Sequence, residues 1–266
     1  MRKIFGFIII SFKKNTQYKK GIIFKIISSF IYLVIQIYFW KMIYSNQNNN
    51  LSMVYTRMVS YLVISQCISL LVFNCDYLYY IKIDIREGRI INHLVRPYDY
   101  MLRYMFESIG KYMVTFLFTL LPMFLMSILF FDLTPPGSVK ALCFTIIFTA
   151  LSFFIYFLMN FILGLTMFWI LDMNGLIPII TNCVFQVCSG ALFPLVYYPG
   201  FIRKIIYILP FRFSADIPVN IYLGNITSMN EILGYLLLLM VWVCILYAIK
   251  TILWKKALRK LCIQGG

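Results

Sequence analysis

Six long runs of apolar residues follow one another along this chain, separated by shorter polar segments. A helix rises about 1.5 Å per residue, so about 20 residues cross the roughly 30 Å of hydrocarbon in a bilayer. Each run is close to that length. The pattern therefore predicts an all-α, polytopic membrane protein with six transmembrane helices, at residues 21–44, 53–74, 112–131, 141–163, 176–197 and 232–249.

The composition supports the same class. Hydrophobic residues make up 62% of the 266 residues, and charged residues make up only 12%. Soluble domains average about 45–50% apolar and about 25% charged residues. Because this chain has too few charges to cover a water-facing surface, we expect most of it to lie in a membrane.

The basic residues are divided unequally between the two sides that the spans define. With the N-terminus in the cytoplasm, 18 of the 24 Lys and Arg residues lie on the cytoplasmic side, which the positive-inside rule favours. The pattern thus predicts a multi-pass plasma-membrane protein with both termini cytoplasmic. The 18 residues are Arg2, Lys3, Lys13, Lys14, Lys19, Lys20, Lys25, Lys82, Arg86, Arg89, Arg96, Arg103, Lys111, Lys250, Lys255, Lys256, Arg259 and Lys260.

A formal net charge of +15 is compatible with nucleic-acid or membrane partners. The basic residues flank apolar runs and no nucleic-acid signature accompanies them, so we expect membrane lipids with anionic headgroups and no nucleic acid. Residues 1–20 combine a basic start with a short apolar core that Lys13 and Lys14 follow at once. They are predicted to form an N-terminal amphipathic helix on the cytoplasmic surface, not a cleaved signal peptide.

Residues 76–111, between the second and third spans, contain a second amphipathic pattern. In KIDIREGRIINHLVRPYDY, Arg86, Arg89, His93 and Arg96 fall within about 80° of arc at 100° per residue. This spacing predicts one short helix that ends near Pro97, with His93 as an ordinary surface side chain. The residues alone leave two interpretations open, a helix that binds lipid headgroups and a docking element for a cytoplasmic protein.

Residues 194–230 are too apolar for an ordinary loop and too rich in Pro and Gly for a straight span. Short helices at 202–209 and 215–223 would form a partly re-entrant outer element between the fifth and sixth spans. Interrupted backbone at membrane depth persists only where protein or a water-filled cavity satisfies its polar groups. An outer gate and a cap that seals the bundle both fit these residues.

The side chains that catalysis requires are scarce. The chain has nine acidic residues, none of which the pattern places firmly in the middle of the membrane, and one histidine. Its seven cysteines have no paired spacing, so no catalytic, cofactor-binding or metal-ligating residue is predicted. The sequence contains no G-x-x-x-x-G-K-[ST] phosphate-binding loop, and a partner would have to hydrolyse any ATP that drives it. We therefore do not expect an enzyme.

The segments DIREGRIINHLVRPYDY and FPLVYYPGFIRKIIYILPFRFSADIPVNIYLG resemble the two signature regions of the type-2 ATP-binding-cassette (ABC) exporter permeases. The similarity is to a bacterial branch of six-span proteins of about this length, and it covers essentially the whole chain. It implies a single transmembrane permease domain over residues 1–266. It also implies that this half-transporter pairs with a second permease copy or paralogue, each half docked on a cytoplasmic ABC ATPase subunit.

The resemblance assigns roles to particular residues. It makes 76–111 the cytoplasmic coupling loop, whose charged-glycine and Arg-Pro pattern is matched by Arg86, Glu87, Gly88, Arg89, Arg96 and Pro97. It makes 194–230 the outer gate, whose pattern is matched by Pro194, Pro199, Pro210, Phe211, Arg212, Pro218 and Gly224. In this scheme, closure of the ATPase pair moves the coupling helices together and switches the spans between inward-open and outward-open states.

Two functional hypotheses follow. The first is the permease subunit of an ABC exporter that moves an amphipathic compound, such as a peptide, antibiotic or lipid, out of the cell. The second is a non-transporting membrane immunity or sensor protein. It would share the six spans and would need neither a second permease nor an ATPase.

Overall fold

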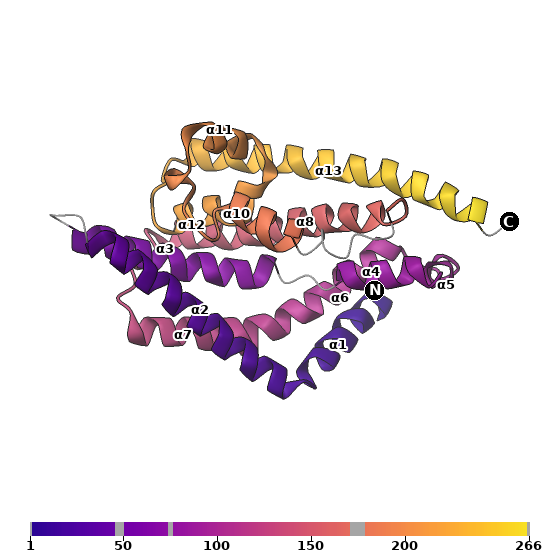
Figure 1. Ribbon diagram of the computed structural model, residues 1–266, viewed down its shortest axis with the longest axis horizontal. Helices are drawn as coiled ribbons and strands as arrows, with labels where there is room; N and C mark the ends of the chain where they lie inside the picture. The colour runs from indigo at the N-terminus through magenta and orange to yellow at the C-terminus, as the bar shows by residue number, and fades with distance from the viewer. Residues whose placement is uncertain (1, 46–50, 74–76, 171–178, 265–266) are drawn as a thin grey trace.

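The computed structural model describes residues 2–45, 51–73, 77–170 and 179–264, and every regular element within them is a helix. Figure 1 shows an elongated molecule in which α8 (Val139–Thr166) lies between α3 (Leu51–Val72) and α13 (Met229–Gln264). The predicted all-α class is confirmed.

Five helical stretches among the described residues are long and apolar enough to cross a membrane. The second of them combines α3 with α4 (Tyr77–Arg86), which the undescribed residues 74–76 separate. These stretches confirm the prediction of a polytopic helical membrane protein. Their bounds are Lys19–Tyr44, Tyr55–Arg86, Tyr100–Phe130, Val139–Thr166 and Met229–Lys260.

The fifth predicted span, 176–197, differs most from the structure. Its start, 176–178, lies outside the described residues, and the described part is the π-helix η2 (Ile179–Val184) followed by α10 (Phe185–Ser189). The helix ends there because Gly190 adopts φ 80°, a left-handed conformation that side chains with a Cβ rarely adopt. The prediction that this helix continues to residue 197 is wrong.

The third span begins earlier than its apolar run. α6 (Tyr100–Thr115), the π-helix η1 (Phe116–Leu120) and α7 (Leu121–Phe130) follow one another without a break. The Asp99 side chain caps α6 by accepting from the Leu102 N–H at 2.9 Å. Because the first turns of α6 carry charged residues, the apolar pattern placed the start of this helix at 112 instead of 100.

The N-terminal segment forms a helix, as predicted. α1 (Arg2–Thr16) and α2 (Lys19–Ser45) meet at a sharp bend near the bottom of Figure 1, and α1 packs along α6. Gly110 permits this approach, because a Cβ there would clash with the Ile8 carbonyl oxygen and lie 2.8 Å from the Ser11 Cβ.

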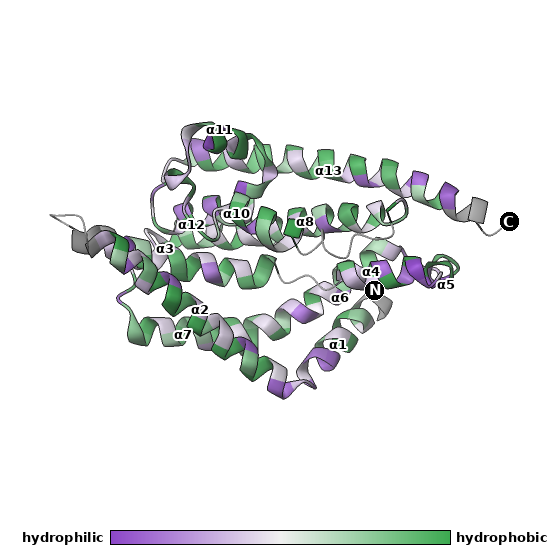
Figure 2. Ribbon diagram, viewed as in Figure 1, coloured by the Kyte–Doolittle hydropathy of each residue, from purple (hydrophilic) through white to green (hydrophobic). Residues whose placement is uncertain are grey.

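α8 is the centre of the larger core. Its Phe148, Ile155, Phe157 and Phe161 are fully buried against α3, α4, α12 (Asp216–Tyr222) and α13. Since lipid is as apolar as these side chains, packing and interhelical hydrogen bonds hold such helices together, and hydrophobic burial contributes little. Figure 2 shows hydrophobic residues along the long helices and hydrophilic residues gathered at α5 (Ile90–Leu94), the α1–α2 bend and the C-terminal end of α13.

Hydroxyl groups supply several of these interhelical bonds. The Tyr77 hydroxyl of α4 donates to the Phe157 carbonyl at 3.0 Å, and the Thr145 hydroxyl of α8 donates to the Pro218 carbonyl at 3.2 Å. The Ser152 hydroxyl, about two helical turns after Thr145 on the same side of α8, donates to the Phe213 carbonyl. α8 is thereby bonded to α4 and to the outer element.

Candidate functional site

The predicted coupling segment consists of two short helices, and the expectation of one amphipathic helix is wrong. α4 ends at Arg86, Gly88 takes φ 68°, and α5 covers Ile90–Leu94. The left-handed glycine reverses the helical path, so the basic residues before and after it do not share one helical face. Pro97 lies three residues after the end of α5, in the connection to α6.

All six predicted coupling residues lie at the surface. Arg86, Glu87, Gly88, Arg89, Arg96 and Pro97 are exposed. Arg89 forms an ion pair with Glu87 at 2.5 Å, in which both side chains stay about half exposed. The apolar side chains Ile91, Leu94 and Val95 are also exposed on and beside α5. We call these nine residues the α5 surface.

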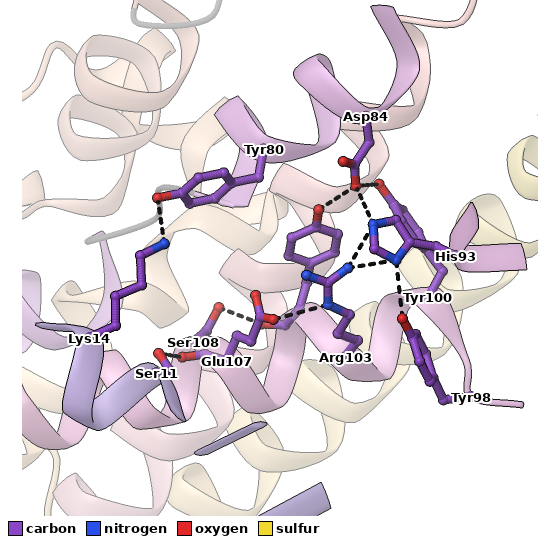
Figure 3. Close-up of polar contacts among 11 residues, drawn as sticks. Ser11, Lys14, Tyr80, Asp84, His93, Tyr98, Tyr100, Arg103, Glu107 and Ser108 are labelled. Atoms are coloured by element: carbon purple, nitrogen blue, oxygen red, sulfur yellow. Dashed lines mark hydrogen bonds and ion pairs between the residues drawn. The ribbon is translucent and has the colours of Figure 1, made fainter. Parts of the chain in front are cut away.

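A buried polar cluster lies behind the α5 surface (Figure 3). The carboxylate of Asp84, 6% exposed, accepts hydrogen bonds from the hydroxyls of Tyr100 at 2.9 Å and Tyr104 at 2.6 Å. His93 Nε2 lies 3.5 Å from the same carboxylate oxygen. Because α4, α5 and α6 each contribute to it, this Asp84 cluster ties the three helices together.

His93 is the member of the cluster that bridges α5 and α6, so its prediction as a surface side chain is wrong. The Nη1 atom of Arg103 lies 2.7 Å from its Nδ1, and the Tyr98 hydroxyl lies 3.1 Å from the same atom. Burial, together with the positive charge of Arg103, holds the pKa of His93 below its ordinary value, although Asp84 acts in the opposite direction. The ring is therefore neutral at pH 7 and accepts from the guanidinium.

The cluster extends to α1 through α6. Arg103 Nε donates to Glu107 at 3.0 Å, and the Ser11 hydroxyl donates to the Glu107 carbonyl at 2.5 Å. Lys14 lies 3.4 Å from the Tyr80 hydroxyl and 4.9 Å from the centre of its ring. These groups surround a cavity of about 490 Å³. The Arg103–Glu107 contact lies within α6, whereas Ser11 joins α1 to α6 and Lys14 joins α1 to α4, so the arrangement can transmit movement between these helices.

Sequence reasoning missed most of this cluster. The sequence patterns assign no role in a site to Asp84, Tyr100, Arg103, Tyr104 or Glu107. The available signal was the helical spacing on α6, where Tyr100 and Tyr104, and likewise Arg103 and Glu107, are four residues apart and share faces. Among the residues that the structure describes, no three His, Cys, Asp or Glu side chains lie close enough together to hold a metal ion.

The outer element contains the predicted short helices. α11 (Gly200–Ile208) and α12 (Asp216–Tyr222) replace the expected 202–209 and 215–223. The 3₁₀ turn η3 (Leu195–Tyr197) precedes α11, and the 3₁₀ turn η4 (Pro210–Ser214) connects α11 to α12. A proline begins or precedes three of the four pieces, because a proline fixes φ and suits the first position of a helical turn, and the fourth piece, α12, has its proline in the first turn. Their positions are Pro194 before η3, Pro199 before α11, Pro210 at the start of η4 and Pro218 inside α12.

Arg212 is the buried cation of the outer element. It is 9% exposed and lies between two aromatic rings, 4.2 Å from the centre of Tyr207 and 5.1 Å from that of Tyr235 on α13. It also lies 3.7 Å from the carboxylate of Asp216, and burial raises the pKa of Asp216 to about 6 although Arg212 lowers it. The neighbouring Phe211 packs on Phe185. Arg212 thus joins η4, α11, α12 and α13.

Helices α2 and α3 bind the segment that precedes the outer element. The Tyr61 hydroxyl donates to the Gly190 carbonyl at 2.8 Å, and the Ser65 hydroxyl donates to the Ala191 carbonyl at 2.9 Å. The hydroxyls of Tyr44 on α2 and Tyr197 in η3 lie 2.5 Å apart. At the far end of the outer element, Gly224 takes φ 71° and lies against Gly137 before α8, with Gly137 N–H donating to the Tyr222 carbonyl at 3.0 Å.

The comparison with protein families identifies the chain. A family model described as ABC-2 family transporter protein matches residues 18–265, a range that takes in the Asp84 cluster, the α5 surface and the outer element. The comparison with curated proteins gives no match. Members of this family are membrane components of transporters. With five helices suited to crossing the bilayer and a family match over nearly its full length, the chain belongs to the ABC-2 transporter family as a multi-pass membrane component.

Proposed function

We propose that this protein is the permease subunit of an ABC exporter. It carries an amphipathic compound, such as a peptide, antibiotic or lipid, across the plasma membrane, driven by ATP that a separate ABC ATPase subunit hydrolyses. The family match supports this proposal, because membership of the ABC-2 family implies association with such a subunit. One observation supports the mechanism above all: the Asp84 cluster connects the α5 surface to α6, which begins the membrane-crossing stretch Tyr100–Phe130.

In this proposal the ATPase docks on the α5 surface. The α5 surface combines exposed basic groups at Arg86, Arg89 and Arg96 with exposed apolar side chains, a composition suited to a protein interface with an apolar centre and a charged rim. Movement of α5 pulls on Asp84 and His93 and passes to Arg103 on α6. Coupling is then mechanical, through buried hydrogen bonds.

The outer element is the external gate in the same scheme. Side chains from α2 and α8 hold it, as does Arg212 against α13, and α3 holds the segment just before it, so displacement of these helices changes its position. Both termini and the α5 surface are cytoplasmic. Two of the five spans, α2 and α13, are the least buried, and they leave apolar faces for lipid and for a second permease copy or paralogue.

The first test is affinity purification of the tagged protein from its native membrane in mild detergent, with mass spectrometry of what accompanies it. We expect a near-stoichiometric ABC ATPase. Arg86→Glu with Arg89→Glu, two exposed positions, should abolish this recovery without changing the amount of inserted permease. The matched control, Lys255→Glu with Lys256→Glu, makes the same charge change at exposed positions of α13 and should leave recovery unchanged.

Two results would contradict the proposal. If the wild-type protein is recovered alone under progressively gentler extraction, an immunity or sensor protein that works without an ATPase becomes the better description. If the ATPase is recovered equally with the double reversal at Arg86 and Arg89, the ATPase docks elsewhere and the α5 surface is not the coupling site.

A further inference from the structure

Two cavities adjoin each other under the bend between α1 and α2. The larger, about 490 Å³, lies between α1, α4, α5 and α6, and the smaller, about 340 Å³, lies between the bend and α6. Asn15 and Lys111 line both cavities. Each volume falls in the range of about 300–1,000 Å³ that is common for small-molecule sites. A ligand bound at Lys111 therefore borders both cavities, and each cavity has room for more than an ion.

Positive charge dominates the lining of this space. Two carboxylates, Asp84 and Glu107, line the larger cavity, and both already accept hydrogen bonds from neighbouring side chains. The residues that line the smaller cavity include Lys25 and Lys111 and no acid. An anion is therefore favoured where the two cavities meet. The basic side chains that line one cavity or both are Lys14, Lys25, Arg89, Arg103 and Lys111.

The surroundings of the bend match the boundary between lipid headgroups and acyl chains. Exposed apolar side chains extend from both helices next to the basic residues of the bend, and Figure 2 shows hydrophilic residues at the bend giving way to hydrophobic ones along α2. A basic helix with such a face lies in the membrane interface. The exposed apolar residues are Phe5, Ile9 and Ile10 on α1 and Ile23, Phe24 and Ile27 on α2.

The chemistry of the smaller cavity changes along α6. From Lys111 it continues past Val114 to Thr119, about 12 Å further along a helix, and Ile22 of α2 lines the opposite side. Its end at Lys111 can hold a phosphate, because lysine binds phosphate as a point charge. The other end of its lining on α6 and η1 is uncharged, and the methyl groups of Val114, Thr115 and Thr119 there can contact a hydrocarbon chain.

We propose that the paired cavities bind an anionic phospholipid. Its phosphate lies between Lys14, Lys25 and Lys111, its polar head extends into the larger cavity, and an acyl chain lies along Val114 towards Thr119. The bound lipid joins the α1–α2 bend to α6 beside the Asp84 cluster. This site requires a membrane protein and is independent of the ATP-driven cycle proposed above, so either proposal can fail without the other.

The test measures lipid binding to the purified full-length protein in phosphatidylcholine mixed micelles, with phosphatidylglycerol that carries a fluorophore on one acyl chain as the probe. Wild-type protein should bind it saturably, and unlabelled phosphatidylglycerol should displace it. Lys25→Gln with Lys111→Gln should weaken binding about 30-fold, from a factor of about five for each lysine beside an anionic headgroup. Lys25→Arg with Lys111→Arg should bind within about threefold of wild type because the charge is kept.

Lys255→Gln with Lys256→Gln removes the same charge from exposed positions of α13 and should leave binding unchanged. Lys14→Gln, at an exposed position, should lower the affinity for the probe about fivefold. It gives a second variant in case the double glutamine variant does not fold.

Equal losses in the α13 control would show general attraction between a basic protein and anionic lipid. Displacement of the probe by inorganic phosphate or glycerol phosphate at the concentration at which phosphatidylglycerol acts would show an anion site without lipid selectivity. Either result overturns the proposal.

Discussion

His93 is the single histidine of the chain, so the protonation of this one imidazole can be followed without overlap from another. The groups around it are Arg103 and Arg96, which disfavour the cation, and Asp84 and Glu107, which favour it. Burial and Arg103 prevail and lower the pKa below 6.5. A lowered pKa means that the neutral ring stabilises the folded cluster above pH 6.5, and that this contribution is lost as the pH falls through the folded-state pKa.

We expect an NMR titration of the protein labelled at histidine to give a midpoint below 6.5. Arg103→Gln should move this midpoint upward, because it removes the nearest positive charge, whereas Lys255→Gln on α13 should not move it. A wild-type midpoint above 6.5 would mean that Asp84 prevails over burial and Arg103, and that the ring is an imidazolium in an ion pair.

Arg212 and Asp216 form a second buried pair with the opposite dependence on pH. Since burial raises the pKa of Asp216 to about 6, its protonated form stabilises the fold, and this contribution is lost as the pH rises through 6. Arg212→Met leaves the carboxylate buried without its cation. We expect the free energy of unfolding to fall by about 3 kcal/mol at pH 8, which is in the range for breaking a buried ion pair. The decrease should be smaller at pH 5, where Asp216 is protonated.

Unfolding in detergent, followed by circular dichroism at the two pH values, measures this difference. The double variant Arg212→Met with Asp216→Leu removes both charges and should recover most of the stability at pH 8, because well-packed apolar residues often replace a buried pair without cost. An equal loss at both pH values would show that Arg212 acts by packing between its two tyrosines alone.

At the scale of elements, the contact between α1 and α6 depends on Gly110. A Cβ at this position meets backbone atoms of α1, which cannot move aside as a flexible side chain could. We expect Gly110→Ala to displace α1 from α6 at a cost of about 1–3 kcal/mol, as for other overpacked contacts, and to speed amide hydrogen exchange in α1. Gly6→Ala is the matched control, since nothing lies within 4 Å of a Cβ there. Unchanged exchange in the Gly110 variant would mean that α1 is held by other contacts.

The elements show which parts of the fold the sequence could predict. Long apolar runs sufficed for the spans at α2, α3, α8 and α13, because length and hydropathy alone define a membrane-crossing helix. Prolines and glycines likewise marked the short helices α11 and α12. The period of 3.6 residues continued through Gly88, however, and only the backbone conformation shows that a glycine with positive φ divides the predicted helix there.

The Asp84 cluster was beyond sequence reasoning for a different reason. Its members come from three helices, and the bond from Ser11 to Glu107 joins residues 96 positions apart. A single sequence contains the local spacing on α6 and not the pairing of α6 with α1 or α4. The residues proposed for coupling and for the gate require no such pairing, because the charged turn and the Pro-rich segment are each continuous in the chain.

For the whole molecule, α8 connects the two proposed sites. At one end Gly164 allows the side chain of Ile81 on α4 to approach, with 3.1 Å between a Cβ at 164 and Ile81 Cγ2. Thr145, near the other end, and Ser152, at the middle of the helix, donate hydrogen bonds to the outer element. A continuous helix of 28 residues transmits displacement between its ends, so movement of α4 beneath the α5 surface should reach the outer element through α8.

This connection predicts that Thr145→Val with Ser152→Ala will separate ATP hydrolysis from movement of the gate. Each lost hydrogen bond weakens the attachment of α8 to the outer element by about 1 kcal/mol, which is too little to prevent folding. The readout is ATP-dependent labelling of a cysteine introduced at Val196, an exposed position in η3. The label is a membrane-impermeant maleimide, and the proteoliposomes contain the co-purified ATPase. A background without native cysteines makes this label specific.

Wild-type protein should show a labelling rate that changes on ATP addition. The double variant should retain ATP hydrolysis and lose most of that change. Thr149→Val is the matched control, because the Thr149 hydroxyl donates only within α8, to the Thr145 carbonyl at 2.7 Å, so its loss leaves the outer element attached. If the double variant keeps the full ATP-dependent change, the movement reaches the gate by another route, and the contacts of α3 with Gly190 and Ala191 are the next to test.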